Sequence, residues 1–350
     1  MKKSKKKFLS ILTLGALASS FIFSTGCQDK TPENVTIIFK NQGQFWEIPK
    51  LGAEHAGEEM NINLTINAPK DEDVKAQAKM VNDAISKKAD AIIIAPSADD
   101  DELADALTTA QNNGIKVLTV DSDMREDVRS SCISTNNEYA GAISARKAYE
   151  IMNGEGEICI LMQSMDSTNS KARVDGFKSQ IQQYNQEVLT EVNKNEDGEE
   201  VAVTEKNEPL KISAVVDGQS DVQKSKDAII QTLNDNPEIK VIFTTSQTTT
   251  VGACMAVDEL GLADSVDILG FDSFQSRDGS KSSDEYLKND ILDGFILQNP
   301  YNIGYLGVRY ARDLINGQSI AASIDTGATL VTKDNVNDSD IQIIMNPMEN

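Results

Sequence analysis

Short apolar segments alternate with longer amphipathic segments along most of the chain after residue 34. The apolar segments predict buried β-strands at residues 35–39, 62–66, 91–95, 116–120, 157–162, 211–216, 240–245, 267–271 and 294–297. In the amphipathic segment 71–88, Val74, Ala78, Val81 and Ile85 fall on one helical stripe, and Asp73 suits its first turn. Similar segments predict helices at residues 48–60, 102–114, 140–152, 170–183, 221–235 and 248–260.

Strand and helix units that alternate at this spacing are typical of parallel sheets with helices on both faces. About four strands are predicted before residue 136 and about five after it, which favours two sheets over one very wide sheet. We therefore expect an α/β protein with two similar, doubly wound lobes. The polar stretch 190–211 interrupts the pattern and is interpreted as a surface insertion.

The N-terminus has the pattern of an export signal. A basic head with five lysines precedes an apolar body and small residues, and Cys27 follows. This arrangement resembles a bacterial lipoprotein signal, although Ser24 departs from the usual aliphatic residue. We expect a signal peptide at 1–26, a lipid anchor on Cys27 and a tether at 27–34. An ordinary signal peptide with an incidental cysteine is the alternative.

The chain is strongly acidic. Its formal net charge is −22 and falls to about −27 when the predicted leader is removed. Such a surface repels phosphate backbones and excludes nucleic acid as a partner. It suits a solvated exported protein, with a specific cationic partner as the alternative. After residue 27 no segment approaches the roughly 20 apolar residues that a membrane span needs.

Few residues are available for metal or nucleophile chemistry. Cys132, Cys159 and Cys254 lie in or beside apolar segments and are expected to be buried thiols. With His55 as the single histidine, neither a zinc site nor a Ser-His-Asp hydrolase can be built. Residues 193–204 match only the front half of a calcium loop, because Thr204 stands where a glutamate is expected. We expect no metal and no cofactor.

Polar and aromatic groups follow the predicted strands. In open parallel sheets, ligands bind at the carboxyl ends of the strands. The residues found there predict a pocket for a small molecule rich in hydroxyl groups. Asp121 and Asp272 would accept hydrogen bonds from the ligand, and the donors would be Arg173, Asn136 and Gln298. Phe45 or Trp46 would supply an aromatic platform, and Ser246 also follows a predicted strand. The alternatives are that the aspartates cap helices or turns, that Arg173 lies on a helix surface, and that the aromatic pair is core.

Several of these segments also carry a family resemblance. "FWEIPKLGAEHAG", "ADAIIIAPSADDDELADALTTAQNNGIKVLTVDSD", "ISTNNEYAG", "KARVDGFKSQI" and "ILGFDS", with "ILQNPYNIGYLGVRYARDLINGQ", occur in the order and spacing of the type I periplasmic sugar-binding proteins. The chain resembles their ribose-binding branch, which delivers substrate to ABC importers, over nearly its whole mature length. The resemblance implies ligand contacts at Phe45, Trp46, Asp121, Asn136, Arg173, Asp272 and Gln298.

The same resemblance implies two lobes joined by three crossovers. We expect an N-terminal lobe at 35–136 plus 300–322 and a C-terminal lobe at 137–298 plus 323–350. The chain departs from the ribose pattern where Gly43 and Gln44 replace Asn-Pro, Ser122 replaces an arginine and Ser220 replaces an aromatic residue. Ser246 and Gln247 replace an Asn-Asp pair. Losing a cationic donor and an aromatic wall changes the cavity, so ribose is not named as the ligand.

The main hypothesis is a monomeric, lipid-anchored, extracytoplasmic protein that captures a monosaccharide or related polyol by lobe closure and passes it to an ABC permease. A receptor for a sugar-like autoinducer that feeds a sensor system is the alternative, since it would share fold and pocket. A regulator of the lactose-repressor type lacks its DNA-binding helices here. A glycosidase is disfavoured, because Asp121 and Asp272 belong to separate sheets without a supporting acid or base.

Overall fold

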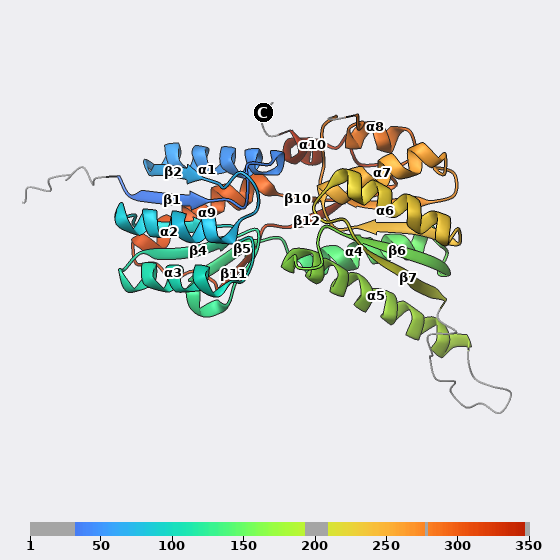
Figure 1. Cartoon of the computed structure of the whole chain (residues 1–350), viewed down its shortest axis with the longest axis horizontal. Coiled ribbons are helices and arrows are strands. Elements are labelled where there is room, and N and C mark those ends of the chain that lie inside the picture. The colour runs from blue at the N-terminus through green and yellow to red at the C-terminus, as the bar shows by residue number, and fades with distance from the viewer. Residues whose placement is uncertain (1–31, 193–208, 277–278, 347–350) are drawn as a thin grey trace, which may run out of the picture. The chain divides into compact units, whose positions relative to one another are not determined.

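Two six-stranded sheets form the framework of the computed structural model, which describes residues 32–192, 209–276 and 279–346 (Figure 1). The predicted signal peptide, Cys27 and the calcium-like segment 193–204 lie outside the described residues. The α/β class and the pair of parallel-sheet lobes predicted from the sequence are confirmed.

The first lobe is built on a fully parallel sheet. In spatial order its strands are β11 (Ser323–Asp325), β5 (Ser131–Ser134), β4 (Lys116–Val120), β3 (Ala91–Ile94), β1 (Asn34–Ile38) and β2 (Asn63–Asn67). Helices α1 (Glu47–Met60) and α9 (Pro300–Ile315) pack on one face, and α2 (Val74–Ser86) and α3 (Asp101–Asn112) pack on the other. The short 3₁₀ helices η1 (Gln44–Trp46) and η2 (Glu126–Val128) also belong to this lobe.

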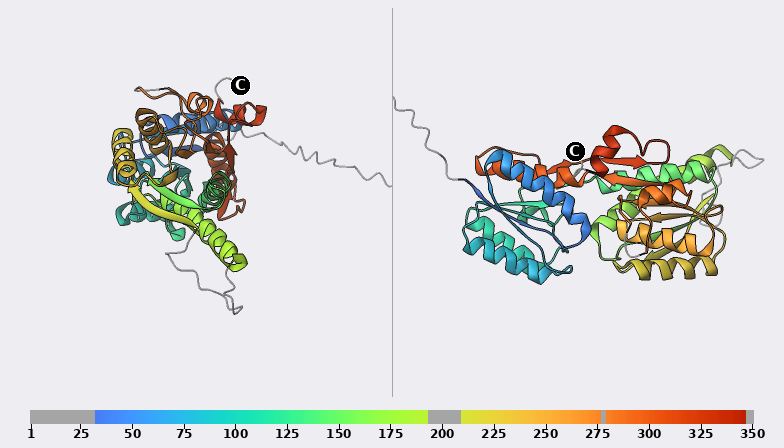
Figure 2. Two further views of the ribbon diagram at one scale, coloured as in Figure 1. Left: turned by 90° about the vertical axis from the view of Figure 1, so that its right-hand side faces the viewer. Right: turned by 90° about the horizontal axis from the view of Figure 1, so that it is seen from above.

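The second lobe repeats this plan with one antiparallel edge. Its strands in order are β12 (Ala328–Val331), β10 (Gly294–Gln298), β9 (Asp267–Phe271), β8 (Ile239–Thr244), β6 (Gly156–Met162) and β7 (Leu210–Asp217), with β12 antiparallel to β10. One face carries α4 (Asn137–Ile151) and α5 (Thr168–Val192). The other carries α6 (Val222–Asp235), α7 (Gln247–Leu260), α8 (Ser283–Lys288) and α10 (Ser339–Met345). Figure 2 shows the helices on both faces of the sheets.

Buried strands explain why both faces are covered. In β3, Ile92 and Ile94 pack toward α2 and α3, whereas Ile93 packs toward α1 and α9. Successive side chains of a strand point to opposite faces, so a continuous isoleucine run needs helices on both sides. Asp73 then starts α2 by accepting hydrogen bonds from the backbone N–H groups of Lys75 and Ala76, both at 3.0 Å.

Three strands were not predicted from the sequence: β5, β11 and β12. Each has three or four residues, so its apolar pattern is too short to stand out. Helix α5 also extends to Val192, past the predicted end at residue 183. Because β11 pairs with β5, residues 323–325 belong to the first sheet, three residues beyond the boundary predicted between the lobes.

The chain passes between the two sheets three times: after β5, after β10, and between β11 and β12. The backbone N–H of Asn136, in the first crossing, donates to Oδ1 of Asp325 at 3.0 Å, in the third. Oδ1 of Asp325 also accepts from the backbone N–H of Gly327 at 2.9 Å. These bonds join two crossing segments at one carboxylate.

Two helices that carry site residues approach each other closely. A Cβ at Gly141 in α4 would overlap the carbonyl oxygen of Arg173 in α5, and one at Gly176 would overlap that of Glu138. Only glycine permits this separation of the helix backbones. Gly141 and Gly176 therefore set the distance between α4 and α5.

Candidate functional site

Two aspartates occupy matching places in the two lobes. Asp121 follows β4 and Asp272 follows β9, and both have left-handed backbones with φ of 62° and 67°. The N–H of Asp121 donates to Ile133 O at 3.0 Å, and that of Asp272 donates to Ile296 O at 2.8 Å. The sheet thus continues for one residue while the backbone turns. Non-glycine residues held at positive φ are uncommon and cluster at functional sites.

Asp121 is the centre of a polar cluster. Its Oδ2 accepts from Lys40 Nζ at 2.7 Å, from Ser122 Oγ at 3.1 Å and from Asn169 Nδ2 at 3.2 Å. Lys40, which lies two residues past β1, also donates to Ser122 Oγ. Asn169 belongs to α5 of the second lobe, so this carboxylate receives donors from both lobes.

Asp272 is linked to Arg173 through Gln298. The amide Nε2 of Gln298 donates to Asp272 Oδ1 at 2.6 Å, and its Oε1 accepts from Arg173 Nη2 at 3.1 Å. Arg173 also donates through Nε to Asn137 Oδ1 at 2.8 Å and through Nη1 to Thr245 O at 2.6 Å. Its guanidinium lies 3.7 Å from the centre of the Phe271 ring. Three hydrogen bonds and one stacked ring fix a planar donor group.

The two carboxylates have pKa values displaced in opposite directions. Burial tends to raise the pKa of Asp121, but Lys40 and Arg173 hold it below its ordinary value. Burial raises the pKa of Asp272 above its ordinary value, although Arg173 and Gln298 oppose this effect. Burial also lowers the pKa of Arg173. The difference follows from the partners, since a lysine contacts only the first carboxylate directly.

The aromatic pair Phe45 and Trp46 stands at the start of α1. Their rings meet edge to face at 5.0 Å between centroids, and Trp46 stacks on Phe39 at 5.0 Å. Trp46 is 7% exposed and contributes to the core of the first lobe while also lining the cavity. Trp46 is therefore both a core residue and part of the cavity wall.

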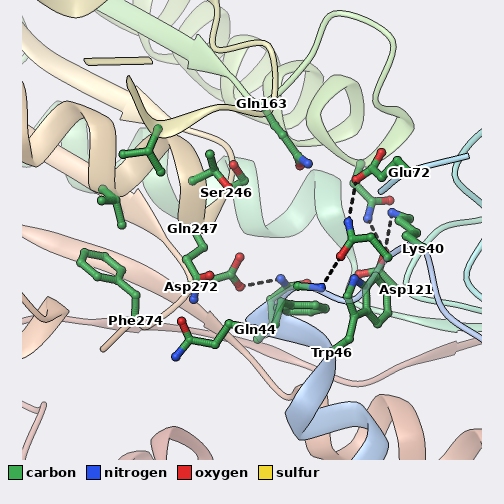
Figure 3. Close-up of a pocket in the computed structure, with 18 of the residues that line it drawn as sticks. Lys40, Gln44, Trp46, Glu72, Asp121, Gln163, Ser246, Gln247, Asp272 and Phe274 are labelled. Carbon is green, nitrogen blue, oxygen red and sulfur yellow. Dashed lines mark hydrogen bonds and ion pairs between the residues drawn. The ribbon is translucent and has the colours of Figure 1, made fainter. Parts of the chain in front are cut away.

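These groups surround one cavity of about 370 Å³ (Figure 3). It receives side chains from both lobes, and its volume lies within the usual range for small-molecule sites. The lining comprises Lys40, Asn41, Gly43, Gln44, Phe45, Trp46, Glu72, Asp121, Gln163, Asn169, Arg173, Val222, Ser246, Gln247, Thr248, Val251, Met255, Asp272, Phe274, Gln275, Ser280 and Gln298.

The structure brings seven of the eight predicted ligand-binding residues to this cavity: Phe45, Trp46, Asp121, Arg173, Ser246, Asp272 and Gln298. Asn136 is the exception. It is exposed, and its side chain caps α4 by accepting from the N–H of Tyr139 at 3.0 Å. The next residue, Asn137, contacts Arg173 instead. Ser246 lines the cavity but uses its hydroxyl to cap α7.

Sequence reasoning missed Lys40, Asn169 and Gln163 as site residues. Lys40 and Gln163 both come shortly after a strand, so the strand-end rule that selected Asp121 also applies to them. Asn169 carries no such signal, since it lies in the first turn of α5 and reaches Asp121 only through packing of the two lobes.

The polar side chains of the site are hydrogen-bond donors and acceptors from both lobes. Among residues 32–192, 209–276 and 279–346, no group of three or more histidine, cysteine, aspartate or glutamate side chains is arranged to hold a metal ion. Cys132, Cys159 and Cys254 are free and buried, as expected. Burial raises the pKa of Cys132 to about 11 and that of Cys159 to about 12, which keeps these thiols protonated at neutral pH.

No helix in the described part of the chain has the length and apolar character needed to cross a membrane. Two parallel α/β lobes with a polar, aromatic-lined cavity at their strand ends define a two-lobed solute-binding protein. The chain belongs to the periplasmic binding protein domain family, whose model matches residues 35–319.

Similar proteins fit this membership. The D-apiose import binding protein of Actinobacillus succinogenes is 26% identical over 81% of this chain and 79% of its own length. The ribose import binding protein of Salmonella typhimurium is 24% identical over 94% of this chain and 99% of its own length. An ABC transporter solute-binding protein from Burkholderia graminis, solved in complex with D-arabinose, is 26% identical, with a TM-score of 0.76 over 87% of this chain and 97% of its own.

Proposed function

We propose that this chain captures a monosaccharide or related polyol outside the cytoplasm and delivers it to an ABC importer. The observation that carries the proposal is the pair Asp121 and Asp272, one from each lobe, which face one cavity together with Arg173 and Gln298. Relatives named for import of apiose and ribose support the class of ligand. The autoinducer receptor finds no support among these relatives.

The ligand-binding roles follow from the contacts. Asp121 and Asp272 accept hydrogen bonds from ligand hydroxyls, while Arg173 and Gln298 donate to ligand oxygens. Phe45 and Trp46 cover the C–H side of a sugar ring. A ligand that touches both aspartates stabilises the arrangement in which the lobes approach, with movement about the three crossing segments.

Fluorescence of Trp46, the single tryptophan, tests the proposal. The protein without its predicted leader, residues 28–350, is titrated with pentoses, hexoses and polyols while emission is followed. We expect a saturable change with one sugar, and a loss of about 1–3 kcal/mol of binding free energy in Asp272→Ala, because ligand hydroxyls lose their acceptor. No emission change and no rise in melting temperature across the panel would reject the proposal.

The membrane attachment is a second, separate proposal. We infer that cleavage before Cys27 exposes its sulfur for lipid, and that the protein acts as a monomer held at the outer face of the membrane or in the periplasm. The export pattern of residues 1–26 supports this inference. A Cys27→Ser variant should leave the membrane fraction, and its continued fractionation with membranes would contradict the anchor.

A further inference from the structure

The cavity continues past the polar groups into an apolar part of the second lobe. Four side chains, Val222, Val251, Met255 and Phe274, line this part, which we call the apolar annex. In Figure 3, Phe274 lies on the far side of Asp272 from Trp46 and Asp121. The polar cluster and the annex are therefore neighbouring parts of one cavity.

The annex is fixed by elements of one lobe. Val251 and Met255 are one turn apart on α7, and Val222 is the first residue of α6. Phe274 is held by Ser283, whose N–H donates to Phe274 O at 3.0 Å and whose Oγ accepts from Phe274 N at 3.3 Å. Since the whole wall belongs to the second lobe, its shape does not depend on how far the two lobes close.

The turn before α6 leaves the annex open to the polar cluster. This turn, between β7 and α6, comprises Gly218, Gln219, Ser220 and Asp221, and none of these four residues lines the cavity. Val251 is 9% exposed and Phe274 is 5% exposed, so both present a limited apolar surface toward the cavity. No bulky side chain of the turn separates this surface from Asp272.

A free monosaccharide does not match such a wall. It carries a hydroxyl on nearly every carbon, and a hydroxyl turned toward valine, methionine and phenylalanine would lose its hydrogen bonds to water without replacement. An apolar substituent would instead bury its surface there, at about 25 cal/mol per Å².

We propose that the annex binds an apolar substituent of the ligand, so that the protein prefers aryl or alkyl glycosides to the free sugar. This inference rests on the proposed function, since Asp121, Asp272 and Arg173 must still hold the sugar. Val222, Val251, Met255 and Phe274 then determine the specificity for the substituent.

Titration calorimetry of the purified protein tests the annex. The probes are D-ribose, D-arabinose, D-glucose and D-galactose, each as the free sugar and as its α- and β-phenyl glycosides. The measured quantity is the dissociation constant of the free sugar divided by that of its phenyl glycoside. We expect a ratio of about ten or more for one sugar and anomer, in line with the discrimination that small apolar groups give in pockets.

Two variants locate the effect. Val222→Phe fills the annex from a partly exposed position and should bring the ratio close to one, and Met255→Gln should lower it by making the wall polar. Val215→Phe is the matched control, because Val215 lies on β7, is 38% exposed and does not line the cavity. Melting temperatures of all variants show whether they fold.

The outcomes separate the two proposals. If a sugar binds the unaltered protein but its phenyl glycosides bind no more tightly than the free sugar, the proposal for the annex is overturned. The proposed sugar-binding function is then unaffected. If Val222→Phe leaves the ratio of the two dissociation constants unchanged, the proposal for the annex is also overturned, because the tighter binding of the phenyl glycoside would then arise elsewhere. If neither free sugars nor phenyl glycosides bind, both proposals fail.

Discussion

Replacing Lys40 by methionine should destabilise the first lobe, because it leaves the Asp121 carboxylate buried without its nearest cation. The Lys40 and Asp121 side chains are 14% and 7% exposed, and Nζ lies 2.7 Å from Oδ2. At that distance the gross attraction is about 6 kcal/mol for an effective dielectric constant of 20. Methionine retains most of the apolar stem, so the change mainly removes the charge.

The net effect is smaller than the gross attraction. Removing one partner of a buried pair costs about 3–5 kcal/mol, but Ser122 and Asn169 still donate to Asp121 in the variant. We therefore expect a loss of about 2–3 kcal/mol in the free energy of unfolding at pH 7. In a cycle with Asp121→Asn, the double variant should be less destabilised than the sum of the single variants by about 2 kcal/mol.

The pH dependence provides a second readout. The pKa of Asp121 is lowered in the folded state, so its contribution is complete above the unfolded pKa and is lost as pH falls through the lower, folded pKa. Without Lys40, burial should raise this folded pKa above the unfolded value, so the cost of the buried carboxylate in the variant is relieved as pH falls, while the unaltered protein loses the contribution of its ion pair. The difference between the two proteins should therefore be greatest near neutral pH and shrink on acidification.

Urea unfolding between pH 4 and pH 8, followed by far-UV circular dichroism, measures both effects. Lys50→Met is the matched control, because Lys50 and Glu54 form an exposed pair at 3.7 Å that should contribute less than about 1 kcal/mol. A coupling energy below about 0.5 kcal/mol at pH 7, or equal pH profiles for Lys40→Met and the unaltered protein, would refute the reasoning.

Three further outcomes are expected. Arg173→Lys should weaken sugar binding at least about tenfold in calorimetry, because an ammonium group cannot replace the planar fork; undiminished affinity would contradict this role. Burial, with Asp267 nearby, raises the pKa of Asp293 to about 7, so its contribution to stability is complete below an unfolded pKa of about 3.9 and is lost as pH rises through 7. Asp293→Asn should therefore gain about 1–2 kcal/mol at pH 8 over the unaltered protein in urea unfolding and nothing at pH 4, unlike the exposed control Asp264→Asn; a pH-independent difference would argue against it. Gly141→Ala should lower the melting temperature by several degrees by separating α4 from α5, and an unchanged value would show that the helices adjust freely.

The sequence was sufficient for the fold class because the strands are buried on both faces. A run such as Ala91–Ile94 can be satisfied only between two layers of helices, and the amphipathic segments on either side supply those layers. The edge strands β11 and β12 lack this signal. Their residues are mostly half-buried or exposed, and their pairing depends on neighbouring strands that are far away in the sequence.

Seven of the eight site residues predicted from the sequence line the cavity, and the exception, Asn136, has a local cause. Asn136 and Asn137 are neighbours at the start of α4, where one residue corresponds to a rotation of about 100°. The first of them folds back to cap the helix at Tyr139 N, so the second is the one that reaches Arg173. Sequence alone does not decide which of two adjacent asparagines becomes the cap, because both have the same capping preference.

Because Ser122 stands in place of an arginine, the sequence predicted a site with one cation fewer. The position of Lys40 changes that conclusion. Lys40 reaches Asp121 from the end of β1, across β3, and the small Ser122 side chain both leaves room for it and accepts its hydrogen bond. Two carboxylates, Asp121 and Asp272, are thus matched by two cations, Lys40 and Arg173. All three donors that contact Asp121 within the described residues meet Oδ2, so Oδ1 can accept from a ligand. The charges of these four groups balance, and the remaining charged side chain of the lining, Glu72, is exposed, so the polar part of the cavity favours a neutral polyol over an acidic or basic ligand.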